Sequence, residues 1–314
     1  MTVQNEYTPQ TEDHDHEPHE ELSFVDRHAI HPLLFALGSM FFVFLLYQVG
    51  GGVLTFLVAD GASVTRENVA VMRWMTIVGQ IGFILIPTLL LARLFAVRLR
   101  EVFQFRIPGL WESTFALLAL FSLQRVLESY MYFQERIPMP ELLRNIVEPL
   151  RKLFEELTKI LLHADSPLEL LAVVIVVAVV PSIVEELLFR GFIQKVFERL
   201  MTPLVAAVFA GTIFGLYHLN PFEIIPLISL GVFFGLLRYR SQSLILPMAA
   251  HFFNNFMAVL ASFYGLQDEN LMTATQTDVS APTMLFALIV FSALFFFVFV
   301  AYLRVTHDTA RRIP

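Results

Sequence analysis

The chain of 314 residues contains no cysteine, which excludes a disulfide framework, a thiolate metal site and a cysteine nucleophile. Charged residues are also scarce, at 16% of the sequence against about 25% in a soluble domain. The hydrolase motifs G-x-S-x-G and H-E-x-x-H are both missing. Any hydrolytic chemistry is therefore left to carboxylates and histidines in some other arrangement.

What the chain has in abundance is apolar surface. Hydrophobic residues make up 56% of the sequence, 32 residues are Phe, and the mean hydropathy is +0.66. This composition predicts an all-α integral membrane protein, a bundle of about eight transmembrane helices in a lipid bilayer with one interfacial amphipathic helix. The net charge of −7 argues against nucleic-acid binding.

The order of polar and apolar segments predicts five regions. The expected regions are a disordered, acidic, His-rich tail at 1–31, three spans at 32–135, an interfacial amphipathic segment at 136–166, a core of four spans at 167–264, and a loop, last span and short basic tail at 265–314. The D-H-D-H-E-P-H run in the tail offers weak metal ligands, but a solvated tail is the favoured interpretation. The amphipathic segment, expected to break near Pro149, is interpreted as a membrane anchor, with a lid over a substrate entrance as the alternative.

The decapeptide P-S-I-V-E-E-L-L-F-R places three charges in an otherwise apolar span. Each charge at that depth costs about 2.5–3.5 kcal/mol on insertion scales, so an acid without a use is unexpected. Glu186 and Arg190 are four residues apart and are predicted to pair on one helix face. Glu185 lies about 100° around the helix without that partner, which suits a general base. Pro181 removes the backbone hydrogen bond to the carbonyl of Val177, predicting a kink and a polar gap.

Two later spans carry histidines at compatible depth. His218 follows Phe214 by one turn, and His251 and Asn255 share a face of the seventh span. Taken alone, His218 is interpreted as a residue of the membrane interface. Asn255 alone fits a polar contact between helices as well as it fits a functional role. Together with Glu185 they predict a site that activates water and stabilises an oxyanion, provided that the fourth span continues past residue 191.

Three motifs in this order resemble one known family. E-E-L-L-F-R at 185–190, F-G-L-Y-H at 214–218 and H-F-F-N-N at 251–255 are similar to the motifs of the CAAX prenyl protease and bacteriocin-processing (CPBP, or Abi) intramembrane proteases, relatives of the Ras-converting endopeptidase. The resemblance implies a conical cavity open to lipid and cytoplasm. It implies that Glu185 with His218 activates water and that His251 and Asn255 hold the oxyanion. Supporting roles fall to Glu186, Arg190 and Phe214.

The resemblance implies an intramembrane endopeptidase acting on a membrane-embedded or lipidated peptide, of the CAAX type or a bacteriocin leader. No cofactor is certain. Zinc held by Glu185, Glu186, His218 and His251 is possible in principle, but no fixed histidine spacing defines such a site, and a metal-free mechanism is favoured. The alternatives are a non-enzymatic scaffold or immunity-type protein of the same fold, and, with less support, a transporter or proton relay, against which the lack of internal repeats argues.

Loop charges predict the orientation. Most of the Lys and Arg outside the amphipathic segment fall on the side of the termini if eight spans are present. The positive-inside rule then places both termini in the cytoplasm, with the protein in the plasma (inner) membrane.

Overall fold

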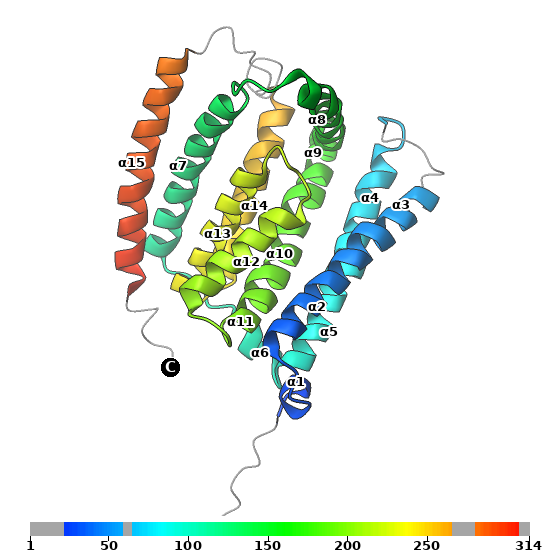
Figure 1. Cartoon of the computed structure of the whole chain (residues 1–314), viewed down its shortest axis with the longest axis vertical. Coiled ribbons are helices and arrows are strands. Elements are labelled where there is room, and N and C mark those ends of the chain that lie inside the picture. Colours follow the sequence, from blue (N-terminus) through cyan, green and yellow to red (C-terminus); the bar gives the residue numbers. More distant parts are fainter. Residues whose placement is uncertain (1–21, 59–64, 266–279, 308–314) are drawn as a thin grey trace, which may run out of the picture.

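The computed structural model describes residues 22–58, 65–265 and 280–307, and within these ranges the chain is helical and contains no strand. Successive long helices run in opposite directions between two ends of the molecule (Figure 1). One end carries α1 and the C-terminus, and the other carries α8, which lies across the bundle. The helices are α1 Phe24–Arg27, α2 Pro32–Leu45, α3 Gly52–Val58, α4 Val69–Gly79, α5 Ile86–Phe95, α6 Leu99–Val102, α7 Leu110–Gln134, α8 Glu141–Leu162, α9 Pro167–Val173, α10 Val180–Glu186, α11 Gln194–Phe197, α12 Pro203–Tyr217, α13 Ile224–Ser241, α14 Ile245–Phe263 and α15 Ala281–Val305.

Short π-helical stretches join helices that together cross the molecule. They are Leu46–Gly51 between α2 and α3, Gln80–Leu85 between α4 and α5, Val174–Val179 between α9 and α10, and Leu187–Ile193 between α10 and α11. A π-helical turn accommodates an extra residue and shifts the direction of the side chains around it, and such turns are frequent at functional sites. Two of the four stretches flank the segment that carries Glu185 and Glu186.

The all-α membrane fold is confirmed. Among the described residues, six helices are long and apolar enough to cross a membrane. The apolar helix α12 is shorter, with 15 residues, and α7 has 25 residues but is not among the six. The expected total of eight spans is therefore not confirmed.

The N-terminal region differs from the expected tail at its inner end. Residues 1–21, including the D-H-D-H-E-P-H run, lie outside the described residues. Residues 22–31, by contrast, are folded: Ser23 caps α1, Val25 is buried, and Asp26 pairs with Arg199 at 2.8 Å. The prediction of disorder fails here because a capped turn and one buried apolar contact are too short to show a periodic pattern.

Helix α8 crosses the end of the bundle without a break at Pro149, contrary to the expected interruption. A proline removes one backbone donor, and here the helix continues through it. The C-terminal end of α8 is held by Arg73, which donates to the carbonyl of Leu161 at 3.1 Å and pairs with Glu169 at 2.7 Å. A cation suits the carbonyl-rich end of a helix. The membrane-anchor and lid interpretations of α8 both remain predictions.

Helices α12 and α13 pack closely through pairs of glycines spaced four residues apart, Gly211 and Gly215 on α12 and Gly231 and Gly235 on α13. A Cβ placed on Gly211 would lie 2.5 Å from the carbonyl carbon of Gly231, and one on Gly235 would lie 2.8 Å from the carbonyl oxygen of Ala207. Since side chains cannot approach backbone so closely, these glycines set the distance between the helices. This packing fixes the position of the short loop that carries His218.

Candidate active site

The predicted residues come together on three helical segments. The fourth span continues past residue 191 as α9 to α11, so that Glu185 and Glu186 lie well within it, as the site requires. His218 is the C-terminal cap of α12, and His251 and Asn255 lie on α14. The two adjacent acids point to different partners and form two distinct pairs.

The inner pair is fully buried. Glu186 Oε1 lies 3.0 Å from Arg190 Nη1, confirming the predicted pairing, and 2.9 Å from His251 Nδ1. Arg190 also donates to the carbonyl of Gly231 on α13 at 2.9 Å. The side chains of Glu186 and Arg190 are both 0% exposed. Because a carboxylate can only accept, His251 donates from Nδ1, and this fixes the orientation of its ring.

Aromatic rings surround this buried cluster. The ring of Phe214 lies against both histidines, with centroids 4.6 Å from His218 and 5.8 Å from His251, and 4.3 Å from the Arg190 guanidinium carbon. Phe234 stacks on His251 at 5.1 Å. Apolar walls exclude water and strengthen the electrostatic contacts between the charged groups. The supporting role of Phe214 stays a prediction.

The outer pair is partly exposed. The side chains of Glu185 and His218 are 15% and 33% exposed, and Glu185 Oε2 lies 3.9 Å from His218 Nε2. The other ring nitrogen of His218 is 2.8 Å from the carbonyl of Phe214, so Nδ1 carries a proton and the Nε2 lone pair of the neutral ring faces Glu185. A separation of 3.9 Å is too long for a direct hydrogen bond but lets one water molecule contact both groups.

Asn255 makes a contact that the sequence partly predicted. Its Nδ2 donates to the carbonyl of Val177 at 2.9 Å, the acceptor that Pro181 leaves without its helical donor. Its Oδ1 accepts from Asn254 at 3.0 Å, and Asn254 in turn accepts from Gln124 on α7. One of the two Nδ2 protons of Asn255 is thus engaged in the helix, and its predicted role at an oxyanion stays a prediction.

The proposed zinc ligands do not form one group. No cluster of three or more His, Asp or Glu side chains able to hold a metal is present within the ranges that the structure describes. Glu186 and His251 bind each other, and the adjacent Arg190 cation opposes a second cation on the same carboxylate. The arrangement does not fit a four-ligand zinc site, and no step below depends on a metal.

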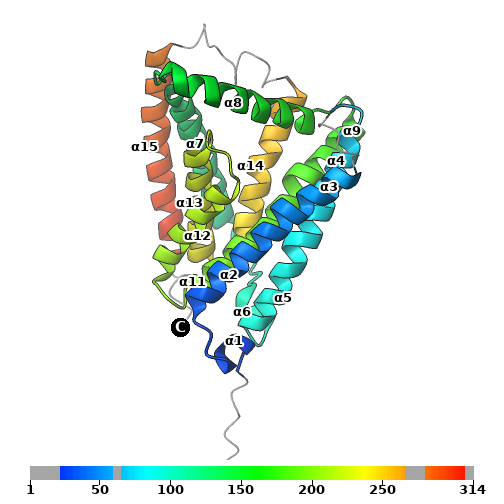
Figure 2. The same ribbon diagram turned by 45° about the vertical axis from the view of Figure 1, so that its right-hand side comes forward.

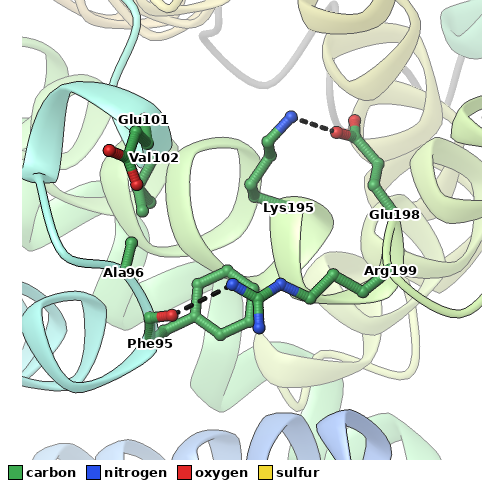
Figure 3. A pocket seen from close by; sticks show the side chains of 7 residues that line it. All are labelled: Phe95, Ala96, Glu101, Val102, Lys195, Glu198 and Arg199. Carbon is green, nitrogen blue, oxygen red and sulfur yellow. Dashed lines mark hydrogen bonds and ion pairs between the residues drawn. The ribbon is translucent and has the colours of Figure 1, made fainter. Parts of the chain in front are cut away.

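Two cavities lie elsewhere. A small polar cavity of about 140 Å³ near the termini is lined by Glu101, Lys195, Glu198 and Arg199 together with apolar side chains. In Figure 3, Lys195 pairs with Glu198, and the Arg199 guanidinium lies over the ring of Phe95. An apolar hollow of about 500 Å³ lies between α7, α13 and α15. Neither is lined by Glu185, His218 or His251.

Sequence reasoning missed two polar neighbours of the outer pair. Gln80 Nε2 donates to Glu185 Oε1 at 3.1 Å. Glu223, in the loop between α12 and α13, faces His218: desolvation by the surrounding protein raises the pKa of its carboxyl above the ordinary value, and His218 partly offsets this. A single amide inside the apolar run I-V-G-Q-I-G was a usable signal for Gln80, whereas nothing in the local pattern marked Glu223.

Comparison with known proteins addresses the same region. Residues 167–257 match a family model described as type II CAAX prenyl endopeptidase Rce1-like. No curated protein and no solved structure matches the chain. The matched range contains all three motifs and both acid–histidine pairs. Residues 167–257 therefore form an Rce1-like domain of the CPBP (CAAX protease) family, as the motifs predicted.

Proposed function

We propose that the protein is an intramembrane endopeptidase that hydrolyses a peptide bond near the C-terminus of a membrane-associated, lipidated protein or peptide. The observation that carries this proposal is the partly exposed Glu185–His218 pair, separated by 3.9 Å, directly beside the buried Glu186–Arg190–His251 cluster. Glu185 is available to act as a base, whereas Glu186 is engaged in the buried ion pair.

In the proposed reaction, a water molecule lies between Glu185 Oε2 and His218 Nε2. Glu185 accepts a proton from the water as its oxygen attacks the peptide carbonyl, and His218 accepts the other hydrogen bond and orients the attack. A proton on His251 Nε2 and the second Nδ2 proton of Asn255 donate to the developing oxyanion. Glu185 then returns its proton to the leaving amine as the carbon–nitrogen bond breaks.

The proposal is tested with Glu185→Gln, which keeps the shape of the side chain and removes the base. Purified protein in nanodiscs is incubated with a farnesylated CAAX-type peptide carrying an internally quenched fluorophore. We expect cleavage by the wild type and a loss of at least about 10²-fold in the variant, the lower range for general base removal. The matched control is Glu128→Gln. This substitution removes another acid of a long helix, one that pairs with Arg125 at 2.6 Å. Cleavage by Glu185→Gln at the wild-type rate would refute the role of this base.

The natural substrate is sought separately, by comparing membrane proteomes of cells that express wild type and Glu185→Gln. A precursor that accumulates only with the variant, and whose C-terminal or leader peptide is missing in the wild type, identifies the substrate. A bacteriocin leader and a prenylated tail are distinguished by which end of the precursor is cut. Identical proteomes, together with an inactive wild type in the peptide assay, would favour the non-enzymatic scaffold.

We also propose that both termini face the cytoplasm. The helix ribbons diverge towards α8, away from the termini (Figure 2). Most of the Lys and Arg outside the amphipathic segment lie on the side of the termini, which the positive-inside rule places in the cytoplasm. Because the chain has no cysteine, Thr65→Cys and Thr202→Cys give single labels at the two ends. We expect a membrane-impermeant maleimide to label only Thr65→Cys in intact cells, and the reverse result would overturn this orientation.

A further inference from the structure

Gln80 reaches the catalytic acid from outside the matched domain. It lies on the second span, at the first position of the π-helical stretch Gln80–Leu85, and is 3% exposed. Its Nε2 donates to Glu185 Oε1 at 3.1 Å. Among the hydrogen bonds of the described residues, this is the one that a side chain donates to Glu185. A buried amide in a lipid-embedded helix is costly unless it is used.

This hydrogen bond decides which oxygen of Glu185 is available. Oε1 is occupied by Gln80, so Oε2 is the oxygen that faces His218. Oε2 is buried and accepts no hydrogen bond from the part of the chain that the structure describes. A glutamate has several rotatable bonds, and a donor fixed on a neighbouring helix selects one orientation of the carboxylate.

Two tyrosines lie on this side of the site. Tyr47, in the first span, lies beside the Gln80 side chain and near the charge of Glu185. Its ring also packs against Gly79, where an added Cβ would approach the ring to 3.3 Å. Tyr217 of α12, whose hydroxyl donates to the carbonyl of Met40 in the first span, is a further electrostatic neighbour of Glu185. The first two spans thus form one wall of the site around its catalytic acid.

We propose that Gln80 is a positioning residue, which holds the Glu185 carboxylate so that Oε2 and His218 share the attacking water and which favours the ionised form of that carboxylate. The proposal rests on the proposed function and extends it to a residue on the second span. Gln80 does not touch the substrate and acts only through Glu185.

The test is Gln80→Met, which keeps the length and volume of the side chain and removes the donor. A hydrogen bond to a charged group contributes enough for its loss to lower kcat about 10- to 100-fold, with KM nearly unchanged. Since the ionised form loses its donor, we expect the acidic limb of the pH–rate profile to move to higher pH by about one unit. Gln80→Glu, which keeps the length but adds a like charge beside Glu185, is expected to shift this limb further.

The matched control is Gln194→Met. Gln194 is also a buried glutamine that donates one hydrogen bond, to the carbonyl of Gly235 at 3.3 Å, but it lies away from the site. It is expected to lose stability while kcat and the pH profile stay unchanged. A folded Gln80→Met protein with wild-type kcat and an unmoved acidic limb, or the same kinetic change in Gln194→Met, would overturn the proposal.

A second readout does not need the protease to be active. Infrared difference spectra of wild type minus Glu185→Gln, recorded as a function of pH, report protonation of the Glu185 carboxyl directly. In the Gln80→Met background this protonation is expected at higher pH. An inactive wild type combined with this shift would refute the proposed function and leave the Gln80–Glu185 interaction standing, whereas an unchanged titration would refute the proposal itself.

Discussion

The buried cluster around Glu186 makes the sharpest prediction, because two adjacent acids should respond differently to the same substitution. Arg190→Met removes the cation and keeps an apolar stem of similar length. Glu186 then stays fully buried with only His251 as a partner, and the carbonyl of Gly231 loses its donor. Glu185→Gln, by contrast, replaces an accessible acid that is not part of the ion pair.

The magnitude follows from the contacts that are lost. Arg190 contributes a 3.0 Å ion pair and a 2.9 Å hydrogen bond, both fully buried. Removing one partner of a buried ion pair costs about 3–5 kcal/mol. For a chain of this size we expect the melting temperature to fall by about 5 °C or more. Removing both charges leaves no unpaired ion, so Glu186→Gln combined with Arg190→Met is expected to be more stable than Arg190→Met alone.

The assay is thermal unfolding in detergent, followed by tryptophan fluorescence and by size-exclusion chromatography after heating. Glu185→Gln is the internal comparison and is expected to melt within about 2 °C of the wild type, as for an accessible side chain outside the packed cluster. The reasoning is refuted if Arg190→Met melts like the wild type, or if Glu185→Gln is destabilised to the same extent. A double variant that is less stable than either single variant would show that the cluster stabilises the fold beyond charge pairing.

Three further predictions concern the scaffold. Gly211→Ala should lower both the melting temperature and the cleavage rate, because its Cβ would strike the backbone of α13, whereas Gly38→Ala, with nothing within 4 Å, should be neutral. Asn255→Leu should cost less stability when combined with Pro181→Ala, since the restored backbone N–H can replace the lost amide donor; equal costs in both backgrounds would contradict this. Glu223 has a raised pKa, so it destabilises the fold once pH exceeds its ordinary value of 4.5. Thermal unfolding should therefore show Glu223→Gln to be more stable than the wild type near pH 8 and equal to it near pH 4.

Much of the site was predictable because its signals are local. The pairing of Glu186 with Arg190 follows from a spacing of four residues in a helix, and the free carbonyl upstream of Pro181 follows from the missing proline N–H. The three motifs on separate spans pointed to the family whose model matches residues 167–257. Glycines spaced four apart in α12 and α13 are a further local signal, since such spacing is typical of closely packed helices.

The sequence could not predict which side chains on different helices pair with each other. The link from His251 to Glu186 rather than to Glu185 depends on how α14 rotates against α10, and no spacing encodes that rotation. The same holds for Gln80, whose approach to Glu185 spans 105 positions. The persistence of α8 through Pro149 was also missed, because an internal proline removes one backbone donor and the local pattern does not show whether the helix continues through it.

Glu185, the proposed catalytic acid, is therefore held by more of the chain than the matched residues 167–257. Within the matched residues, Glu185 has His218 as its partner at 3.9 Å, and the hydrogen bond that orients its carboxylate comes from Gln80, far outside that range. Asn255 is likewise tied, through Asn254, to a helix that precedes the domain. A segment limited to the matched residues would keep all three motifs but lose these constraints. Reactivity at this site should accordingly depend on the first three spans as much as on the motifs, because orientation of a base contributes to catalysis as directly as its chemical identity.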